Sequence, residues 1–350
     1  MKFESLEGIR GFAAVYVFLH HLDPLAGTPW APLLKLGQEA VLLFFLVSGF
    51  VIAYSYLGAR ARKSATRFLY HRAIRIYPIF LAALALSALA AVVAGTTGCI
   101  NAQALAGNLL MLQDIGFLKS GTWVEPFCAN LPLWSLAYEW WCCVAFAILF
   151  ASERWSMRAR RRVVAAGALL GAGLFLVHPS QAFLFAAYFS LWWAGLELAL
   201  EFLRERKISF RGQQFSMFLL LACAAIWAIP VVRALALQMP LVLGREPFLQ
   251  LRHFGAGIVF LILAIVASRV TIVPNGVIRL FSRAAPWSYG LYASHQPVID
   301  LVRAMHLGAP LAMVVTVCLA FLVAYLLEIV IHPRVAAWLA GPGLTTNLQK

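Results

Sequence analysis

Residues 37–57 read GQEAVLLFFLVSGFVIAYSYL and contain one charged side chain, that of Glu39. The hydrocarbon core of a bilayer, about 30 Å thick, is crossed by roughly 20 predominantly apolar residues in a helix. The stretch therefore predicts a transmembrane helix. The whole chain has the same character, because 63% of its 350 residues are apolar and only 12% are charged. A soluble domain has about 25% charged residues, so this composition indicates a polytopic membrane protein.

Ten apolar runs of this kind predict an all-α polytopic membrane protein with about ten transmembrane helices. We expect these helices at 9–28, 37–57, 76–95, 131–151, 163–178, 182–202, 215–233, 254–268, 286–305 and 309–331. In this prediction residues 1–335 form one transmembrane domain and residues 336–350 a short cytoplasmic tail. No appended soluble domain is expected.

The net charge of +14 comes from Lys and Arg side chains that gather in alternate loops. The clusters lie at 60–75, 154–162, 204–211 and 269–283, and such a bias is typical of cytoplasmic loops. Both termini are therefore predicted to be cytoplasmic. Most aromatic residues lie inside the apolar runs, so the sequence has no basic surface interleaved with stacking aromatics, and we exclude a nucleic-acid partner.

The six cysteines are too few and too scattered for a disulfide framework or a metal site, and no metal is expected. Four of them lie in apolar runs and are interpreted as packing residues: Cys142, Cys143, Cys223 and Cys318. Cys99 and Cys128 differ, because both flank the polar loop 96–130. They could pair if that loop faces an oxidising compartment.

Arg10 and His21 lie in the first apolar run, where ionisable side chains are costly and are candidates for function. They are eleven residues apart, which on a helix is three turns plus about 20°, or about 16 Å along the axis. Both therefore face one side of the helix, whereas His20 points about 80° away. Two structural alternatives stay open: an arginine that extends to the helix end, and a histidine hydrogen-bonded in the core.

The segment 67-RFLYHRAIRIYP-78 places Arg72 and Arg75 at i and i+3, on one helical face. Paired guanidinium groups suit phosphate. The alternative is that these arginines only set the topology. Pro78 is predicted to lie in the first turn of the third transmembrane helix.

The segment 132-PLWSLAYEWW-141 places Ser135 and Glu139 on one helical face. Glu139 is expected about 12 Å from the external end of its helix, at the depth of His21. A carboxylate and an imidazole at one depth could act as a base and its orienting partner. A structural ion pair of Glu139 with Arg10 or another cation is the alternative.

In 287-WSYGLYASHQP-297 the side chains of Tyr289, Tyr292 and His295 form a polar stripe. Ser48 and Gly49, in the second apolar run, are small residues that favour close helix packing. Three acidic residues near helix ends are interpreted as interfacial: Glu197, Asp300 and Glu328.

Five motifs occur in a fixed order along nearly the whole chain. They are 6-LEGIRG-11 with His21, 44-FFLVSGF-50, 72-RAIRIYP-78, 134-WSLAYE-139 and 288-SYGLYASH-295. Together they resemble the membrane acyltransferase family 3, the O-acyltransferases of bacterial surface glycans. Two departures from the family pattern are small: Glu7 replaces the usual Asp, and Ala293-Ser294 replaces the usual Leu before the histidine.

The resemblance implies an O-acetyltransferase of the bacterial inner membrane that uses cytoplasmic acetyl-CoA as co-substrate. Arg72 and Arg75 would bind the donor phosphates, and Arg10 would guide the donor or hold a carboxylate. His21 would act as general base on a hydroxyl of a cell-surface or lipid-linked glycan, with Glu139 orienting it. An acyl-imidazole at His21 is the competing mechanism. The remaining substrate-cavity residues would be Ser48, Ser135, Tyr292 and His295.

Two other classes of protein stay open at this stage. Intramembrane His, Glu and Arg also suit a proton-coupled transporter or flippase of a glycan intermediate. The sequence lacks the matched broken helices in two related halves that such carriers usually have. A non-catalytic scaffold of a polysaccharide-synthesis complex would leave the alignment of Arg10 with His21 unexplained. The sequence does not identify the glycan, the acyl chain length or the oligomeric state.

Overall fold

In the computed structural model, residues 3–58, 64–242, 244–270 and 273–340 are described, and over these residues the chain is all-helical. The helices are α1 (Phe3–Leu22), α2 (Gly37–Leu57), α3 (Ala65–Val93), α4 (Ala102–Leu109), α5 (Trp134–Phe150), α6 (Met157–Val177), α7 (Gln181–Glu205), α8 (Gln214–Ala236), α9 (Phe248–Ala267), α10 (Asn275–Ser282), α11 (Ser288–Ala304), α12 (Ala309–Tyr325), the π-helical η6 (Leu326–Ile331) and α13 (His332–Ala340). Short 3-10 turns are η1 (Ala31–Leu34), η2 (Thr97–Cys99), η3 (Phe127–Ala129), η4 (Leu131–Leu133) and η5 (Ala285–Trp287).

Seven helical segments among the described residues are long and apolar enough to cross a membrane. They are Ala31–Leu57, Ala65–Val93, Leu131–Phe150, Gln181–Glu205, Gln214–Ala236, Phe248–Ala267 and Ala309–Leu339. The three other predicted spans also fall on helices, but α1 and α6 carry several charged residues and α11 is short. The all-helical class is therefore confirmed, whereas the ten spans and the cytoplasmic termini stay predictions.

The third helix begins eleven residues before its predicted start. Ser64 is its N-cap, because the Ser64 hydroxyl accepts a hydrogen bond from the Arg67 backbone N–H at 3.2 Å. Pro78 consequently lies inside α3, and the prediction that it occupies the first turn was wrong. The apolar run marks the part of this helix suited to lipid, while the helix itself extends through the polar residues before it.

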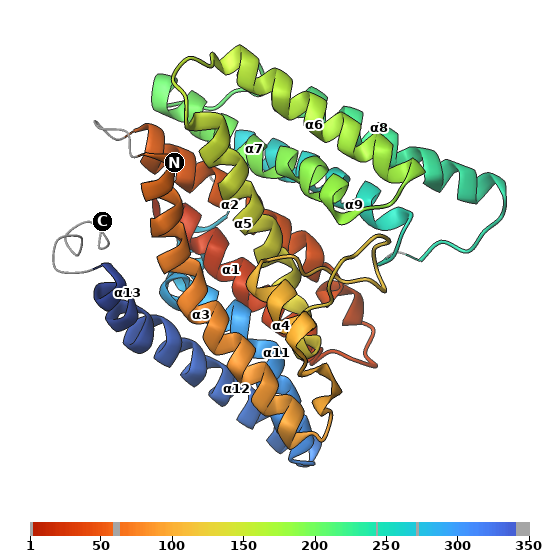
Figure 1. Ribbon diagram of the computed structural model, residues 1–350, viewed down its shortest axis with the longest axis vertical. Coiled ribbons are helices and arrows are strands. Elements are labelled where there is room, and N and C mark those ends of the chain that lie inside the picture. The colour runs from red at the N-terminus through yellow and green to blue at the C-terminus, as the bar shows by residue number, and fades with distance from the viewer. Residues whose placement is uncertain (1–2, 59–63, 243, 271–272, 341–350) are drawn as a thin grey trace.

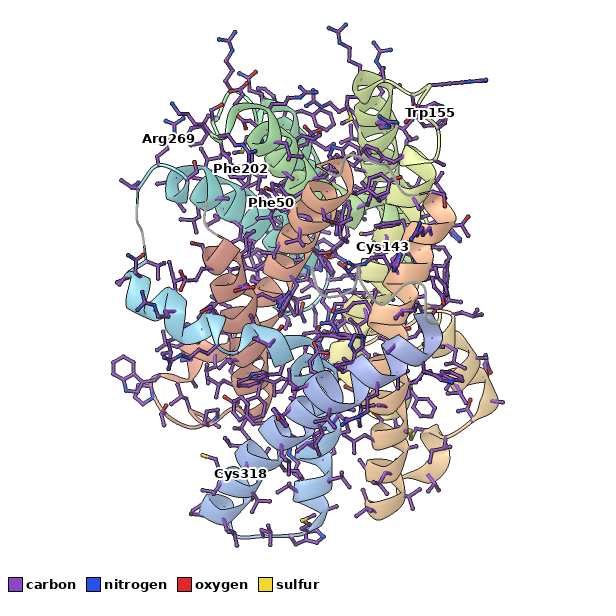
Figure 2. The ribbon with its side chains drawn as sticks, turned by 90° about the vertical axis from the view of Figure 1, so that its left-hand side faces the viewer. Phe50, Cys143, Trp155, Phe202, Arg269 and Cys318 are labelled. Atoms are coloured by element: carbon purple, nitrogen blue, oxygen red, sulfur yellow. A yellow bond between two sulfur atoms is a disulfide. The ribbon has the colours of Figure 1, made fainter. Side chains whose placement is uncertain are left out.

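The helices are arranged around α2 and α11. Helix α2 packs along α7, and α6, α7, α8 and α9 form one side of the molecule (Figure 1). Helix α11 packs against α1, α3 and α12, and the C-terminal α12 and α13 lie on the opposite side (Figure 1). Trp155 and Arg269, from two of the predicted cytoplasmic loops, lie at one end of the molecule, and Cys318 lies toward the other (Figure 2). Arg60, Arg62 and Lys63 of the first basic loop, and 341–350 of the predicted tail, lie outside the described residues.

Two glycines allow α2 and α7 to pack closely. A Cβ atom at Gly49 of α2 would lie 2.0 Å from the carbonyl oxygen of Trp192, and a Cβ at Gly195 of α7 would lie 2.0 Å from that of Leu46. Because neither helix has a side chain at the crossing, their backbones touch. The predicted packing role of the second-helix glycine is confirmed, and this contact positions the neighbouring Ser48.

The segment 96–130 is tied to the helices. Cys99 and Cys128 form a disulfide, the pairing that the sequence left open. The Trp141 indole donates a hydrogen bond to the Met111 carbonyl at 2.9 Å. Of the free cysteines, Cys142, Cys143 and Cys223 are buried as expected for packing residues. Cys318 is exposed on α12, so its interpretation as a packing residue was wrong.

Candidate functional site

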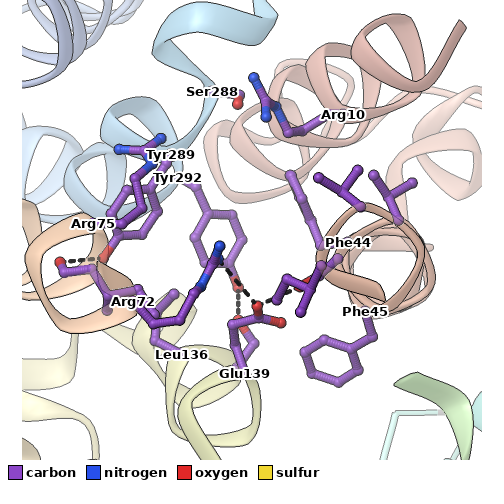
Figure 3. A pocket seen from close by; sticks show the side chains of 16 residues that line it. Arg10, Phe44, Phe45, Arg72, Arg75, Leu136, Glu139, Ser288, Tyr289 and Tyr292 are labelled. Carbon is purple, nitrogen blue, oxygen red and sulfur yellow. Dashed lines mark hydrogen bonds and ion pairs between the residues drawn. The ribbon is translucent and has the colours of Figure 1, made fainter. Parts of the chain in front are cut away.

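A cavity of about 240 Å³ lies within the helices and holds three arginines and one carboxylate. We call it the arginine cavity. Its lining is Arg10, Phe44, Phe45, Val47, Ser48, Val51, Ile52, Arg72, Arg75, Ile76, Ser135, Leu136, Glu139, Ser288, Tyr289 and Tyr292. These residues come from α1, α2, α3, α5 and α11, so segments far apart in the sequence meet around one space (Figure 3).

Glu139 of α5 is held at the wall of the arginine cavity. Its Oε1 accepts a hydrogen bond from the Ser48 hydroxyl at 2.5 Å and lies 3.9 Å from Nη2 of Arg72. The Trp192 indole donates to the same serine oxygen at 3.3 Å. A buried carboxylate needs such partners, because an unpaired charge in a low-dielectric interior is costly. Glu139 therefore forms an ion pair, which was the alternative left open by the sequence, and its partner is Arg72 and not Arg10.

Arg75 forms a two-pronged ion pair with Glu328 of η6. Its Nη1 and Nη2 donate to the two carboxylate oxygens at 2.9 and 2.6 Å. The Glu328 side chain is only 2% exposed, so the interpretation of this residue as interfacial was wrong. Tyr289 lies beneath the guanidinium, 5.2 Å from its carbon to the ring centre. The pair uses two of the five guanidinium N–H groups, which leaves three for another partner.

Arg10 has no carboxylate partner among the described residues. Its Nη2 donates to the Ala285 carbonyl at 2.8 Å, while its Nε is buried without a hydrogen-bond partner. The Nε of Arg72 is also buried and unpartnered. With Glu139 and Glu328 counted against the three arginines, the cavity keeps one excess positive charge. Such a site suits an anion, and phosphate oxygens fit guanidinium donors best.

Ser135 and Tyr292 form one hydrogen-bonded unit in the cavity wall. Their hydroxyl oxygens are 2.6 Å apart, and the Tyr292 hydroxyl donates to the Pro132 carbonyl at 2.8 Å. The Ser135 hydroxyl also lies 3.5 Å from the same Pro132 carbonyl oxygen, so both side chains are anchored to one backbone acceptor. The structure thus places Ser48, Ser135 and Tyr292, which were expected in the substrate cavity, in the same lining as the arginines.

His21 and His295 lie next to this cavity and not in its lining. Their rings are stacked with centroids 5.1 Å apart, and we call them the histidine pair. The Nδ1 of His295 is 3.0 Å from the Leu291 carbonyl oxygen, which can only accept, so the proton is on Nδ1. The Nε2 of His295 is buried and has no hydrogen-bond partner in the described part of the chain. Its lone pair is therefore available to a ligand or a proton.

The structure does not join His21 to Glu139. Across the described residues no hydrogen bond or ion pair connects them, because Glu139 faces Ser48 and Arg72 while His21 faces His295. Tyr292 stands between, since it lines the arginine cavity and its ring centre is 6.2 Å from that of His295. Arg10 and His21 do face one side of α1, toward Ala285 and His295 of the η5–α11 segment.

Sequence reasoning missed several buried charged groups, among them Glu197 and Lys119. Glu197 was interpreted as interfacial, yet it is buried and accepts hydrogen bonds from Arg161 at 2.8 and 2.6 Å. Lys119 of the 96–130 segment is buried beside Asp114 at 2.7 Å, with its ammonium 3.7 Å from the ring centre of Trp134. Burial lowers the pKa of the Lys119 ammonium, and Asp114 opposes that shift. The only feature of the sequence that could have indicated this buried pair is the presence of a lysine in a loop with few other charged residues.

A sequence profile described as an acyltransferase domain matches residues 3–329. The chain belongs to the acyltransferase 3 family. This match confirms the family membership that the five sequence motifs indicated. No solved structure matches this acyltransferase 3 chain. Among its described residues no group of three or more His, Cys, Asp or Glu is placed to hold a metal ion.

Curated relatives match parts of this acyltransferase 3 chain. Acyltransferase MdmB of Streptomyces mycarofaciens is 33% identical over 164 residues, which are 44% of this chain and 41% of that protein. Nodulation protein 10 of Rhizobium leguminosarum bv. viciae is 30% identical over 172 residues, 45% of each chain. Protein 2 in picA locus of Rhizobium radiobacter is 39% identical over 89 residues, 25% of this chain and 44% of that one. The chain thus covers less than half the length of these relatives.

Proposed function

We propose that this membrane acyltransferase transfers an acetyl group from cytoplasmic acetyl-CoA to a hydroxyl of a cell-surface or lipid-linked glycan. The proposal includes a bacterial inner-membrane location, cytoplasmic termini and a catalytic unit formed by residues 1–335. Lipids and the glycan are its expected partners. The observation that carries it is the arginine cavity, which is lined by three guanidinium groups and one carboxylate, with a second carboxylate, that of Glu328, bound to Arg75.

The positive charge of this cavity supports its assignment as the binding site of the acetyl-CoA donor. Coenzyme A is polyanionic, and a buried excess of guanidinium groups is favourable for phosphate. Arg10 and Arg72 each have a buried Nε without a partner, so each has a donor to offer. Arg75 is fixed by Glu328 and contributes its remaining N–H groups. The acyl arm would extend past Tyr292 toward the histidine pair.

His21 is the proposed general base. The acceptor hydroxyl oxygen attacks the thioester carbonyl carbon while its proton passes to the His21 imidazole. The carbon–sulfur bond then breaks, and the coenzyme A thiolate takes the proton from His21. The products are an O-acetyl ester and free coenzyme A, so atoms and charges balance. His295 would hold the His21 ring in place, and Glu139 would position Arg72 and Ser48 in the donor cavity.

The test is acetyl-CoA binding and acetyl transfer by purified protein in detergent. We expect saturable binding, competed by coenzyme A, that weakens about tenfold or more in Arg72→Gln, because a hydrogen bond to a charged group is lost. Arg279→Gln is the matched control, since Arg279 is exposed on α10 and outside the cavity. Absence of binding by folded wild-type protein would refute the proposal, and equal weakening in both variants would refute the assignment of the donor site.

A further inference from the structure

A second cavity lies further along two of the helices that line the arginine cavity, α3 and α11. It has a volume of about 420 Å³, within the range of about 300–1,000 Å³ usual for small-molecule sites. We call it the α3–α11 cavity. Its lining is Ala90, Ala91, Val93, Ala94, Thr96, Cys128, Ala129, Asp300, Arg303, Ala304 and His306.

Helices α3 and α11 run from the first cavity to the second. On α3, Arg75 lines the arginine cavity and Ala90 lines the α3–α11 cavity, about 22 Å further along the axis. On α11, Tyr292 lines the first and Arg303 the second. Eleven residues of helix separate this last pair, so both side chains lie on one face within about 20°.

The histidine pair lies between the two cavities. His295 is one turn after Tyr292 of the arginine cavity and five residues before Asp300 of the α3–α11 cavity. His21 is stacked on it. A group bound in either cavity would therefore approach the same imidazoles from opposite sides.

The polar groups of the α3–α11 cavity neutralise one another. The Asp300 carboxylate accepts hydrogen bonds from the Gln296 amide at 3.0 and 3.2 Å and lies 3.6 Å from Nη1 of Arg303. Thr96 and His306 add further donors and acceptors, while alanines and Val93 supply most of the apolar lining. Balanced donors and acceptors within an otherwise apolar lining suit a neutral polyhydroxylated ring better than an anion.

The walls of this cavity are held in place. Asn130 is fully buried and its amide donates to the Ser87 hydroxyl at 3.0 Å and the Ala293 carbonyl at 3.1 Å. These bonds fix the end of the 96–130 segment to α3 and α11. The Cys99–Cys128 disulfide closes the same segment, and Cys128 is part of the cavity wall.

We propose that the α3–α11 cavity binds the acceptor, as a neutral sugar ring whose hydroxyl is presented to the histidine pair. The inference rests on the proposed acetyl transfer. In the assignment, Asp300 accepts hydrogen bonds from sugar hydroxyls and Arg303 donates to them, while the acetyl donor occupies the arginine cavity.

The first test uses membranes of the cells from which the protein comes, which contain its natural acceptor, and radiolabelled acetyl-CoA. The variant Ala304→Cys is made in a protein that also carries Cys318→Ser, which removes the exposed free thiol. Its activity is measured before and after reaction with a bulky polyethylene glycol maleimide, and reductant is left out so that the disulfide stays intact. We expect labelling to remove nearly all acetyl transfer to glycan and to leave acetyl-CoA binding within twofold. Met305→Cys is the matched control, because Met305 is exposed one residue further on and outside the cavity lining.

The second test uses point variants in the same membranes. Asp300→Asn and Arg303→Gln should each slow transfer about tenfold or more at unchanged acetyl-CoA affinity, because a hydrogen bond to a charged group is lost. Wild-type transfer by labelled Ala304→Cys, or by both point variants, would overturn the inference. If the wild-type protein did not bind acetyl-CoA, the proposed function itself would be refuted. Failure of the acceptor-site inference is therefore distinguishable from failure of the proposed function.

Discussion

The imidazole rings of His21 on α1 and His295 on α11 are stacked, with centroids 5.1 Å apart and ring planes 20° apart. The helices run in the same direction here, since Arg10 of α1 bonds to Ala285 at the start of the same segment. One face of α1 therefore follows η5 and α11 from the arginine cavity to the histidine pair. The Nδ1–H of His295 is fixed by the Leu291 carbonyl, which leaves its Nε2 as a free acceptor.

His21→Ala is expected to abolish acetyl transfer, because general-base catalysis contributes about 10²- to 10⁴-fold. Acetyl-CoA affinity should change little, since His21 does not line the arginine cavity. Single-turnover transfer and equilibrium binding measure the two effects separately. His178→Ala is the control, because His178 is exposed at the end of α6. Normal turnover by His21→Ala would exclude His21 as the base.

His295→Asn is expected to reduce the rate of transfer without abolishing it. Asparagine could still donate to the Leu291 carbonyl but would remove the free ring nitrogen and the stacked face. A positioning role predicts a lower kcat, a changed pH profile of kcat and an unchanged acetyl-CoA Kd. If the His295→Asn variant lost activity only because it is less stable, and the pH profile of kcat stayed unchanged, His295 would be a purely structural residue.

Seven candidate residues named from the sequence line the arginine cavity, whereas most of their hydrogen-bond partners were not predicted. Depth along a helix follows from 1.5 Å per residue, so His21 and Glu139 could be set at one level of the membrane. The direction in which each faces depends on which helices are neighbours, and that is decided by tertiary packing. The contact of Gly49 with Trp192 brings α2 to α7, and the packing of α2 and α3 beside α5 gives Glu139 the partners Ser48 and Arg72.

Buried charges were the other limit of sequence reasoning. Glu328 and Glu197 lie near the ends of the spans predicted at 309–331 and 182–202, where acidic residues are usually solvated. Nothing local in the sequence reveals the arginine that each one binds. The two partners lie on other helices, Arg75 on α3 and Arg161 on α6. The helices themselves were predictable, because their apolar runs are local in the sequence.

The pair of Arg75 and Glu328 allows the structural and donor-binding roles of Arg75 to be separated. Glu328→Leu leaves a partly buried arginine without its partner and should lower the free energy of unfolding by about 3 kcal/mol. The double variant Arg75→Met, Glu328→Leu should recover most of that stability, because an apolar pair can replace a buried ion pair. Acetyl-CoA binding should stay weak in the double variant. Thermal unfolding and binding of the same samples test this, and full recovery of both would show that Arg75 is only structural.

Gly195→Ala should destabilise the protein by about 1–3 kcal/mol, because the new methyl group would meet the Leu46 backbone carbonyl and push α2 from α7. Acetyl-CoA binding should weaken as well, since α2 lines the arginine cavity. Gly173→Ala in α6 is the matched control, because a Cβ there meets nothing within 4 Å. Alanine is favoured over glycine in helices by about 1 kcal/mol, so the control should be slightly stabilised. Thermal unfolding decides, and equal behaviour of the two variants would contradict the close backbone contact.

Removal of the disulfide should affect stability and acceptor use together. Cys99 and Cys128 are separated by 29 residues, a loop for which the chain-entropy model gives about 3–4 kcal/mol of stabilisation. The double variant Cys99→Ser, Cys128→Ser should lose that amount in unfolding measurements. Because Cys128 is part of the α3–α11 cavity wall, transfer to glycan should fall more than acetyl-CoA binding. Cys318→Ser removes an exposed free thiol and should change neither quantity. A double variant that keeps full transfer despite its lower stability would separate the disulfide from acceptor binding, since the cavity wall would then be held by Asn130 alone.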